Sequence, residues 1–345
     1  MFSVAVFKRG VKIIVILFFI LVLLLVVFYF WAGSSTLPEE KLAEIIVFSD
    51  KTAISPVKQE VFTVMSYNIG YLSGMTNNLP MKPGKPLFEK NMETFLQLVK
   101  EVQPDFIGFQ EIDFHSRRSH YINQLRTIAE KSDYTCAAKA INWDKRYVPF
   151  PYWPPSIHFG RMLSGQAVLS RRPILSAKRI VLQKPKNQPF YYNTFYLDRL
   201  VQVVTVKIDS KDLIILNVHL EAFEQETRET QAKRVLNIYR SLKDDYPVLL
   251  MGDFNCVPPD AARKKNFLDE PGTDFSNDKT IEVFFKEKSL SRASPAFTYP
   301  ADKPNRKLDY IFYNHDKIKL IHAFVPKINS SDHLPVVMQF ALMSH

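Results

Sequence analysis

Hydrophobic residues form two kinds of pattern along the chain from about Val61 onward. Nearly continuous apolar runs, which are typical of strands buried on both faces, alternate at first with segments whose apolar residues recur every three or four positions. The clearest helical segment has apolar residues at Phe88, Met92, Phe95, Leu96, Val99 and Val102, and it ends before Pro104. Because strands and helices alternate in this way, the pattern predicts an α/β layered fold.

Apolar runs predict strands over 61–69, 105–109, 134–138, 164–170, 174–182, 200–208, 213–218, 248–251, 307–313 and 336–342. Helical spacing predicts helices over 88–102, 121–129 and 225–242. The later part of the chain is therefore richer in strands than the earlier part.

Residues 141–162 break both patterns, since they contain four prolines and six aromatic residues. This proline density argues against a regular helix or a central strand. The segment is therefore either a long loop packed on the domain or a substrate-facing rim whose aromatic side chains meet an apolar or planar group. A second aromatic cluster, at 190–196, allows the same two interpretations.

The N-terminal region contains an uncharged apolar run of 19 residues, from Ile13 to Trp31. A helix of this length covers the roughly 30 Å hydrocarbon core of a bilayer. Basic residues precede the run and acidic residues follow it, which places residues 1–12 in the cytoplasm and the catalytic domain outside it. A cleaved signal peptide is the alternative. The run exceeds a signal-peptide core of about 7–15 residues, so we favour a single-pass, uncleaved anchor.

Residues 32–59 show no sustained period and contain Pro38 and Pro56, so we interpret them as a stem between the anchor and a single domain over 60–345. A short helix from Pro38 to Phe48 is an alternative for part of this stem. Nothing in the stem suggests chemistry.

The composition narrows the class of protein further. A hydrophobic fraction of 46% supports a large core, and a formal net charge of +10 suits an anionic partner such as a phosphate ester, nucleic acid or lipid headgroups. Charge does not choose among these three partners. Only two cysteines, Cys136 and Cys256, are present, so a disulfide framework and a cysteine-rich zinc site are excluded.

Polar side chains stand at the ends of several predicted strands: Asn68, Glu111, Asn217 with His219, Asp253 with Asn255, and Asp332 with His333, while Asp309 lies inside a further strand. Asp253 and Asn255 are two residues apart on an extended segment, so they project to the same side and could hold a metal or aim a water. The same pair also fits an Asx-type turn. Ligands collect at strand ends in layered α/β folds, and so many polar ends together favour a shared site over independent turns.

The motifs MSYNIG, FQEID, LNVHL, GDFN, LDYIF and SDHLP follow one another in this order between residues 61 and 342. The series resembles that of the endonuclease/exonuclease/phosphatase superfamily, which includes pancreatic-type deoxyribonucleases, abasic-site endonucleases, neutral sphingomyelinases and inositol polyphosphate 5-phosphatases. The resemblance implies a four-layer α/β sandwich, in which two packed mixed sheets are flanked by helices. Here this sandwich would be preceded by one transmembrane helix.

The resemblance also implies roles in phosphoester hydrolysis for the candidate residues. Glu111 would be the principal ligand of Mg²⁺, or of Mn²⁺ in its place, with Asn68 beside it and Asp332 as a further metal candidate. Oxygen ligands of this kind suit a hard dication. Asp253 would orient or deprotonate the attacking water, and Asn255 would hold the phosphate.

Two histidines complete the implied site. His333 would contact the phosphoryl oxygens, with its imidazole fixed by Asp309. His219 would be the second candidate acid for the leaving oxygen, and Asn217 would support it as part of the substrate-binding group.

These expectations describe a membrane-anchored, magnesium-dependent phosphoester hydrolase, and the two histidines favour a phosphodiesterase. The anchor and the aromatic segment at 143–159, which would reach the bilayer surface, favour a lipid or small phosphodiester. The alternative is a DNA or RNA endonuclease, supported by the basic charge and by family precedent. Neither aromatic segment carries a basic helix or a base-reading motif, so nucleic-acid specificity has no support in the sequence. A catalytically inactive binding module is disfavoured, because the carboxylates and both histidines are present.

Overall fold

The strands assemble into two mixed β-sheets in the computed structural model, which describes residues 4–48, 59–77 and 79–343. The seven-stranded sheet has the order β1 (Ala43–Val47), β4 (Cys136–Val148), β5 (Gly160–Ser170), β3 (Phe106–Asp113), β2 (Phe62–Asn68), β13 (Val336–Leu342) and β12 (Ile318–Phe324). The six-stranded sheet has the order β10 (Leu290–Arg292), β11 (Asp309–Asn314), β9 (Val248–Asp253), β8 (Lys211–His219), β7 (Leu200–Ile208) and β6 (Ile174–Val181).

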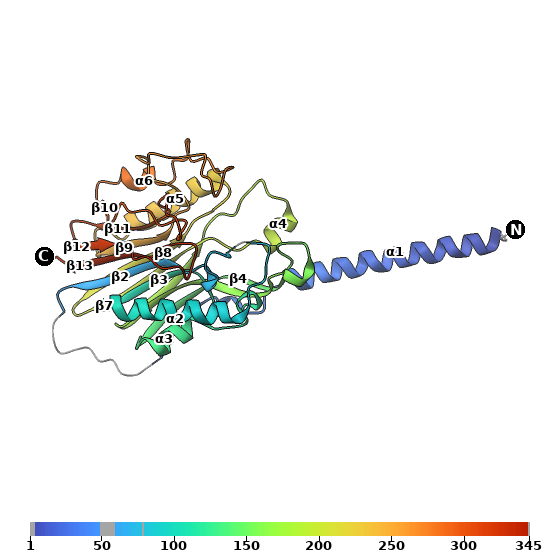
Figure 1. Ribbon diagram of the computed structural model, residues 1–345, viewed down its shortest axis with the longest axis horizontal. Coiled ribbons are helices and arrows are strands. Elements are labelled where there is room, and N and C mark those ends of the chain that lie inside the picture. The colour runs from blue at the N-terminus through green and yellow to red at the C-terminus, as the bar shows by residue number, and fades with distance from the viewer. Residues whose placement is uncertain (1–3, 49–58, 78, 344–345) are drawn as a thin grey trace.

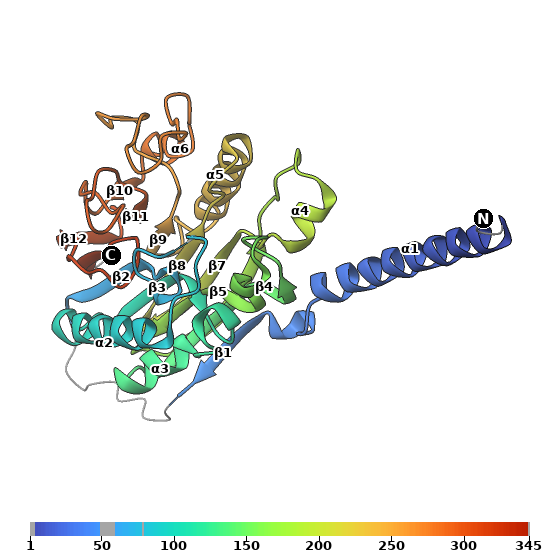
Figure 2. The same ribbon diagram turned by 45° about the vertical axis from the view of Figure 1, so that its right-hand side comes forward.

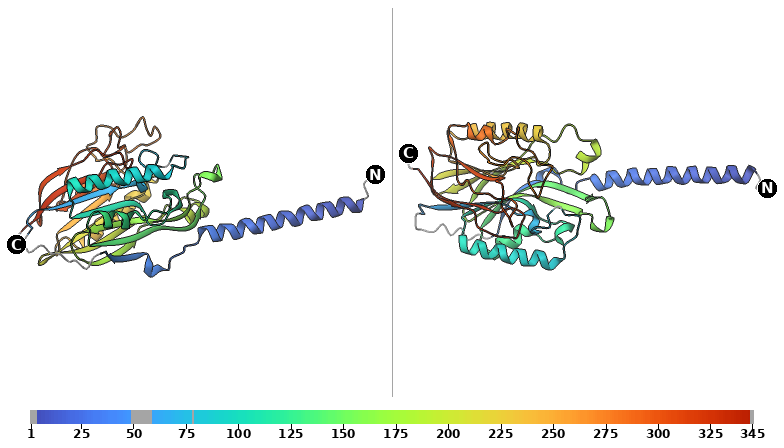
Figure 3. Two further views of the ribbon diagram at one scale, coloured as in Figure 1. Left: turned by 60° about the horizontal axis from the view of Figure 1, so that its bottom comes forward. Right: turned by 45° about the horizontal axis from the view of Figure 1, so that its top comes forward.

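The two sheets pack face to face, and helices cover both outer faces (Figure 3). The outer helices are α2 (Lys85–Val102) and α3 (Gln124–Lys131) on the seven-stranded sheet, and α5 (Gln225–Arg240) and α6 (Glu282–Phe285) on the six-stranded sheet. Three apolar clusters fill the spaces between the four layers, one under each helix pair and one between the sheets. The predicted four-layer α/β sandwich is therefore confirmed.

The strand register brings the polar strand ends to one end of the sandwich. Strands β8 and β9 are parallel and place His219 opposite Asp253, while antiparallel β11 places Asp309 opposite Asp253. In the other sheet, β2 and β3 are parallel, and their pairing ends at Asn68 and Gln110. Because the carboxyl ends of parallel strands lie at the same edge of a sheet, residues distant in sequence meet there.

Helix α1 (Val4–Gly33) projects away from the domain as a single long rod (Figure 1). It is long and apolar enough to cross a membrane, and its side chains from Val6 onward are exposed along most of its length. Its last turns contact the domain, where the ring of Phe28 lies 5.7 Å from that of Tyr147 and Lys145 Nζ donates to Gly33 O at 2.8 Å.

The stem interpretation needs a correction, because Ala43–Val47 forms strand β1 at the edge of the seven-stranded sheet. Its apolar residue Ile46 packs against the core cluster together with Leu42 and Phe48, which gives this short segment a reason to pair with β4. The short-helix alternative survives only as a turn of 3₁₀ helix at Glu39–Lys41. Residues 49–58 of the predicted stem, 1–3 of the predicted cytoplasmic segment, and 78, 344 and 345 of the predicted domain lie outside the described residues.

The proline-rich segment also begins later than the sequence suggested. Strand β4 continues to Val148 and β5 begins at Gly160, so only the connection over 149–159 is irregular, with one 3₁₀ turn at Pro155–Ile157. The prolines start at Pro149, and the preceding residues pair with β5, with register shifts between Ile141 and Trp143 and between Lys145 and Val148. The second aromatic cluster forms the short helix α4 (Phe190–Phe195).

Candidate active site

A cavity of about 640 Å³ lies at the end of the sandwich where the polar strand ends meet. Its wall includes most of the predicted site residues: Glu111, His219, Asp253, Asn255, Asp332 and His333. Asn68 and Asp309 lie directly behind this wall, hydrogen-bonded to Asp253 and His333 respectively. Eight of the nine predicted residues are thus brought together.

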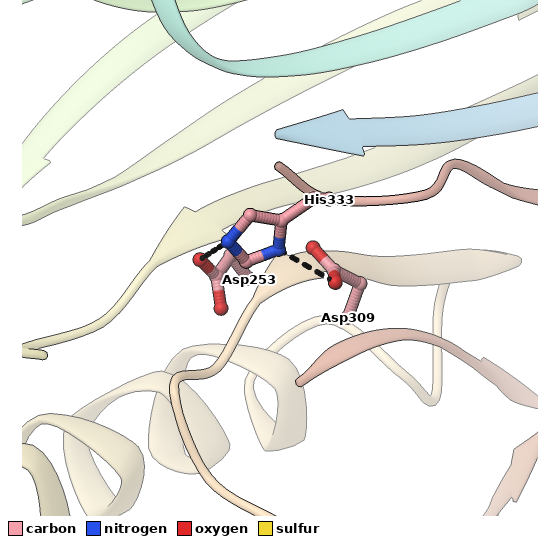
Figure 4. A group of neighbouring side chains, drawn as sticks. All are labelled: Asp253, Asp309 and His333. Atoms are coloured by element: carbon pink, nitrogen blue, oxygen red, sulfur yellow. Dashed lines mark hydrogen bonds and ion pairs between the residues drawn. The ribbon is translucent and has the colours of Figure 1, made fainter. Parts of the chain in front are cut away.

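His333 lies between two buried carboxylates (Figure 4). Its Nδ1 is 2.9 Å from Asp309 Oδ2, and its Nε2 is 3.8 Å from Asp253 Oδ2. Asp309 and Asp253 are each 1% exposed. The Asp309 contact fixes the orientation of the imidazole, so that Nε2 points toward Asp253 and the cavity.

These contacts shift the pKa values of the residues in the site. Burial opposes the charged form of His333, but Asp309 and Asp253 outweigh it and hold the pKa of His333 well above its usual value. Burial raises the pKa of Asp253 to about 7, with Asp309 adding to the increase and His333 opposing it. A carboxylate with a pKa near neutrality is suited to accept a proton from water.

His219 has the opposite electrostatic character. Burial lowers its pKa well below the usual value, and the positive charges of Arg199 and His333 lower it further. Its Nε2 lies 3.5 Å from Asp253 Oδ2 and 3.9 Å from Glu111 Oε1. A neutral imidazole in this position donates a hydrogen bond, so His219 fits hydrogen bonding to a leaving oxygen better than the transfer of a proton to it.

Glu111 reaches the cavity through an irregularity in its strand. The β3–β5 register shifts between Phe109 and Ile112, and Glu111 has a positive φ of 53°. Few non-glycine residues adopt this conformation, and such strain is concentrated at functional sites. Asn68 Nδ2 bridges the two carboxylates, at 3.3 Å from Glu111 Oε1 and 2.9 Å from Asp253 Oδ2.

Gly252 lies within β9, opposite Val218 of β8 and one residue before the strand ends. Its φ is +142°, and a Cβ at this position would lie 1.9 Å from Val218 O on the neighbouring strand. No side chain fits there, so the glycine allows β8 and β9 to approach closely. Asn255 then adopts a φ of +49°, and its N–H donates to Asp253 Oδ1 at 2.8 Å, which confirms the Asx-type turn and leaves the residue on the cavity wall.

Asp332 belongs to the loop before β13. Asn77 Nδ2 donates to both of its oxygens at 3.1 Å, and Ser331 Oγ ties the loop to β2 by donating to Asn68 O at 2.8 Å. Burial raises the pKa of Asp332, and the negative charge of Glu111 contributes to the increase although His333 opposes it. The Glu111 and Asp332 carboxylates therefore repel each other across the cavity.

The repulsion between Glu111 and Asp332 indicates that these residues fit a metal ion. A dication near Glu111 and Asp332 would relieve the repulsion, and carboxylate and amide oxygens are the donors that Mg²⁺ prefers. Asp253, Asp309 and His333 form a second group whose ligand atoms all lie within 4.8 Å of one another. In that group His333 Nδ1 is already hydrogen-bonded to Asp309 Oδ2 at 2.9 Å, so these two atoms are occupied by each other. The donor chemistry therefore favours Glu111, Asn68 and Asp332.

Asn217 is the predicted residue that contacts none of the other predicted site residues. Its Nδ2 donates to Phe109 O at 3.0 Å, and its Oδ1 accepts from Gln110 Nε2 at 2.6 Å, between the two sheets. It shares a face of β8 with His219, as predicted, but it lies two residues further from the strand end and therefore further from the cavity. Its hydrogen bonds join the sheets, which is a structural task and not a substrate contact.

Several cavity residues were missed by the sequence analysis: Asn77, Arg118, Tyr299 and Arg199. Arg199 is 4% exposed, and within the described part of the chain its Nε and Nη1 donate no hydrogen bond. The ring of Tyr299 lies 4.7 Å from that of His333. Only Arg199 left a signal, as a cation directly before the apolar run 200–208, whereas the others depend on how loops fold back.

The comparisons with known proteins agree with this geometry. A model of the endonuclease/exonuclease/phosphatase family matches residues 65–333, which is most of the chain. The chain belongs to this family. Members of the endonuclease/exonuclease/phosphatase family are hydrolases of phosphoester bonds and generally depend on a divalent metal.

Solved structures of the family share the fold of this chain. A family member from Beutenbergia cavernae is 19% identical, covers 82% of this chain and 72% of its own, and has a TM-score of 0.57. The human Nocturnin catalytic domain is 17% identical, and the match covers 90% of this chain and 100% of the Nocturnin domain, with a TM-score of 0.55. A mannosyl-6-phosphatase from Bacteroides thetaiotaomicron is 16% identical, and the match covers 82% of this chain and 100% of the phosphatase, with a TM-score of 0.56. No curated protein matches the chain.

We expect Asp309→Asn to change the pH dependence of hydrolysis. The amide oxygen of the substituted side chain could still accept the hydrogen bond from His333 Nδ1, but the negative charge that raises the pKa of His333 would be lost. If activity needs the His333 cation, the alkaline limb of kcat/KM should move to lower pH by roughly one unit or more. A pH–rate profile measures this shift, and an unmoved limb would show that the charge of His333 is not required.

Proposed function

We propose that this protein is a membrane-anchored, magnesium-dependent phosphoester hydrolase that cleaves phosphodiesters of a lipid or a small molecule. The observation that carries the proposal is the convergence of four carboxylates and two histidines around one cavity: Glu111, Asp253, Asp309, Asp332, His219 and His333. With a metal ion held by the carboxylates, this set of side chains would neutralise a phosphate, orient a water and stabilise a leaving oxygen, which are the three requirements of phosphoester hydrolysis.

Each residue has a role that follows from its surroundings. Glu111 and Asn68, with Asp332 as a further ligand, would hold Mg²⁺, or Mn²⁺ in its place. When bound, the metal would supply positive charge to the phosphate oxygens. Asp253 would orient and deprotonate the attacking water, since its raised pKa of about 7 favours proton transfer near neutrality. Asn255, on the cavity wall, would hold the phosphate.

The cations of the site would bind the developing negative charge. His333, fixed by Asp309, would contact the phosphoryl oxygens and carry the proton available for the leaving group. Neutral His219 would donate a hydrogen bond to the leaving oxygen. Arg199 forms a buried ion pair with Glu221, at 3.6 Å from Nε to Oε2, while its Nη1 has no hydrogen-bond acceptor among the described residues and would bind a further phosphate oxygen. Two imidazoles on either side of Asp253 favour a diester, which has a second esterified oxygen to stabilise.

The membrane part of the proposal rests on α1. The candidate span is Val6–Gly33, and Lys8, Arg9 and Lys12 at its start favour a cytoplasmic N-terminus with the domain on the opposite side. The endonuclease alternative rests on the net charge of +10. The cavity mouth instead carries aromatic side chains from 149–159 and from α4, which favours a substrate with an apolar part.

The test uses the purified full chain in detergent, with and without Mg²⁺. We would assay an aryl phosphodiester, an aryl phosphomonoester, a dispersed phospholipid and duplex DNA. Mg²⁺-dependent diester turnover that is lost in His333→Ala would support the proposal. His322→Ala is the matched control, because His322 is an exposed histidine on β12, an edge strand of the seven-stranded sheet, and does not line the cavity. Preference for the monoester or DNA would replace the diester assignment, and no turnover in a folded chain would leave a binding role.

A further inference from the structure

Five exposed aromatic residues surround the mouth of the cavity, and we call them the aromatic rim: Tyr152, Trp153, Phe190, Tyr191 and Phe223. Between 57% and 78% of each residue is exposed. Three of them, Tyr152, Tyr191 and Phe223, line the same cavity as His219 and Asp253. Large aromatic side chains gathered in this way on a surface indicate an interaction site.

Two segments that carry four of the five rim residues, α4 and the 149–159 connection, are tied to the end of α1. The ring of Phe190 lies 6.0 Å from that of Tyr29, and Tyr29 Oη hydrogen-bonds Thr194 Oγ1 in α4. The 149–159 connection is tied to the same place, because His158 bridges Tyr152 O and the hydroxyl of Tyr147, whose ring packs on Phe28. Figures 1 and 2 both show α4 and the end of β4 beside the base of α1.

When α1 crosses a bilayer, these contacts set the depth of α4 and of the 149–159 connection. Phe28 and Tyr29 lie only two or three residues before Trp31, where the uncharged run ends. With a rise of about 1.5 Å per residue, they lie within roughly 5 Å of the end of the apolar span. Residues in contact with Tyr29 therefore sit at the level of the lipid headgroups when α1 crosses the bilayer, which is where tyrosine and tryptophan are enriched.

We propose that the aromatic rim is seated in the headgroup region of the bilayer that α1 spans, and that the substrate is a lipid phosphoester entering the cavity from that surface. The chemistry of this inference rests on the proposed hydrolase function, whereas the seating of the rim does not. Arg146, which donates to Ser34 Oγ at 3.0 Å beside the helix end, adds a cation at the same level for anionic headgroups. The aromatic cavity wall provides the apolar surface that the lipid body needs.

The seating of the rim can be measured by tryptophan quenching in the full chain, reconstituted in nanodiscs with headgroup-proximal brominated phosphatidylcholine. Trp31→Phe removes the helix tryptophan, so that half-buried Trp143 and exposed Trp153 remain. We expect the brominated lipid to reduce the fluorescence of the Trp31→Phe protein. This quenching should disappear in the Trp31→Phe/Trp153→Phe protein. Ile321→Trp in the Trp153→Phe background is the matched control, because Ile321 is exposed on β12, at the opposite edge of the sheet from β1 and β4. Quenching of the control equal to that of Trp153, or no quenching of Trp153, would overturn the seating.

Entry of a lipid substrate from the bilayer is tested with the double variant Trp153→Ser/Phe190→Ser. Both residues belong to the aromatic rim but lie outside the cavity wall. We expect the hydrolysis of a phospholipid in the same nanodisc to fall about tenfold, because the rim loses interfacial area, while hydrolysis of a soluble aryl phosphodiester is unchanged. An equal effect on both substrates would overturn entry from the bilayer. Absence of all hydrolysis in the unmodified chain would refute the proposed function and with it the lipid substrate, while the quenching result would still decide the seating.

Discussion

Replacement of Glu111 by Gln is expected to lower kcat/KM for a phosphodiester by about 10³-fold at a fixed low Mg²⁺ concentration. The substitution keeps the size of the side chain and its contact with Asn68, so the irregular β3 backbone can persist. It removes the carboxylate that we propose as the principal metal ligand and that opposes Asp332 across the cavity. We therefore expect the Mg²⁺ concentration for half-maximal activity to rise, and part of the lost activity to return at high Mg²⁺.

The measurement is a Mg²⁺ titration of kcat/KM, combined with calorimetric Mn²⁺ binding to the same protein. Glu130→Gln is the matched control, since Glu130 is an exposed residue of α3 that pairs with Arg126. The control should behave as the unmodified chain does. Unchanged metal affinity and activity in Glu111→Gln would move the metal to Asp253, Asp309 and His333, the second group of potential ligands.

The layered fold could be predicted from the sequence because its central strands appear as clear, nearly continuous apolar runs. The runs at 200–208 and 336–342 coincide with β7 and β13, since both strands are buried by neighbours on either side. Strands β1, β10 and β12 were missed. They lie at sheet edges, where mixed exposure weakens the apolar pattern.

The site was predictable to the extent that strand ends determine position. A polar residue that ends a parallel strand, such as Asp253, is placed by the fold itself, and the register then brings His219 and Asp309 opposite it. Two features depend on details that no periodicity encodes. The register shift that turns Glu111 outward is one, and the depth that leaves Asn217 between the sheets is the other. Arg199 enters the site only because β7 pairs with β8.

Asp253→Asn is expected to lower kcat by about 10³-fold, while KM changes much less. The amide is the same size, and its oxygen can still accept the hydrogen bond from the N–H of Asn255, so the turn after β9 should be kept. It cannot accept a proton from water. Because burial raises the pKa of Asp253 to about 7, the carboxylate form of the unmodified enzyme increases as the pH rises toward 7. Its kcat/KM should therefore rise over that range, and the residual activity of the variant should lack this acid limb.

Steady-state kinetics between pH 5 and 9 would separate this role from a structural one. Asp212→Asn is a suitable control, because Asp212 lies at the start of β8, the opposite end of the strand from His219, and pairs with Lys207. A structural role for Asp253 would lower activity equally at every pH and alter the melting temperature. A variant that kept both its activity and its acid limb would show that another group activates the water. The raised pKa of Asp253 would then reflect only the burial of an acidic residue between two histidines, and the case for a hydrolase would rest on the remaining carboxylates.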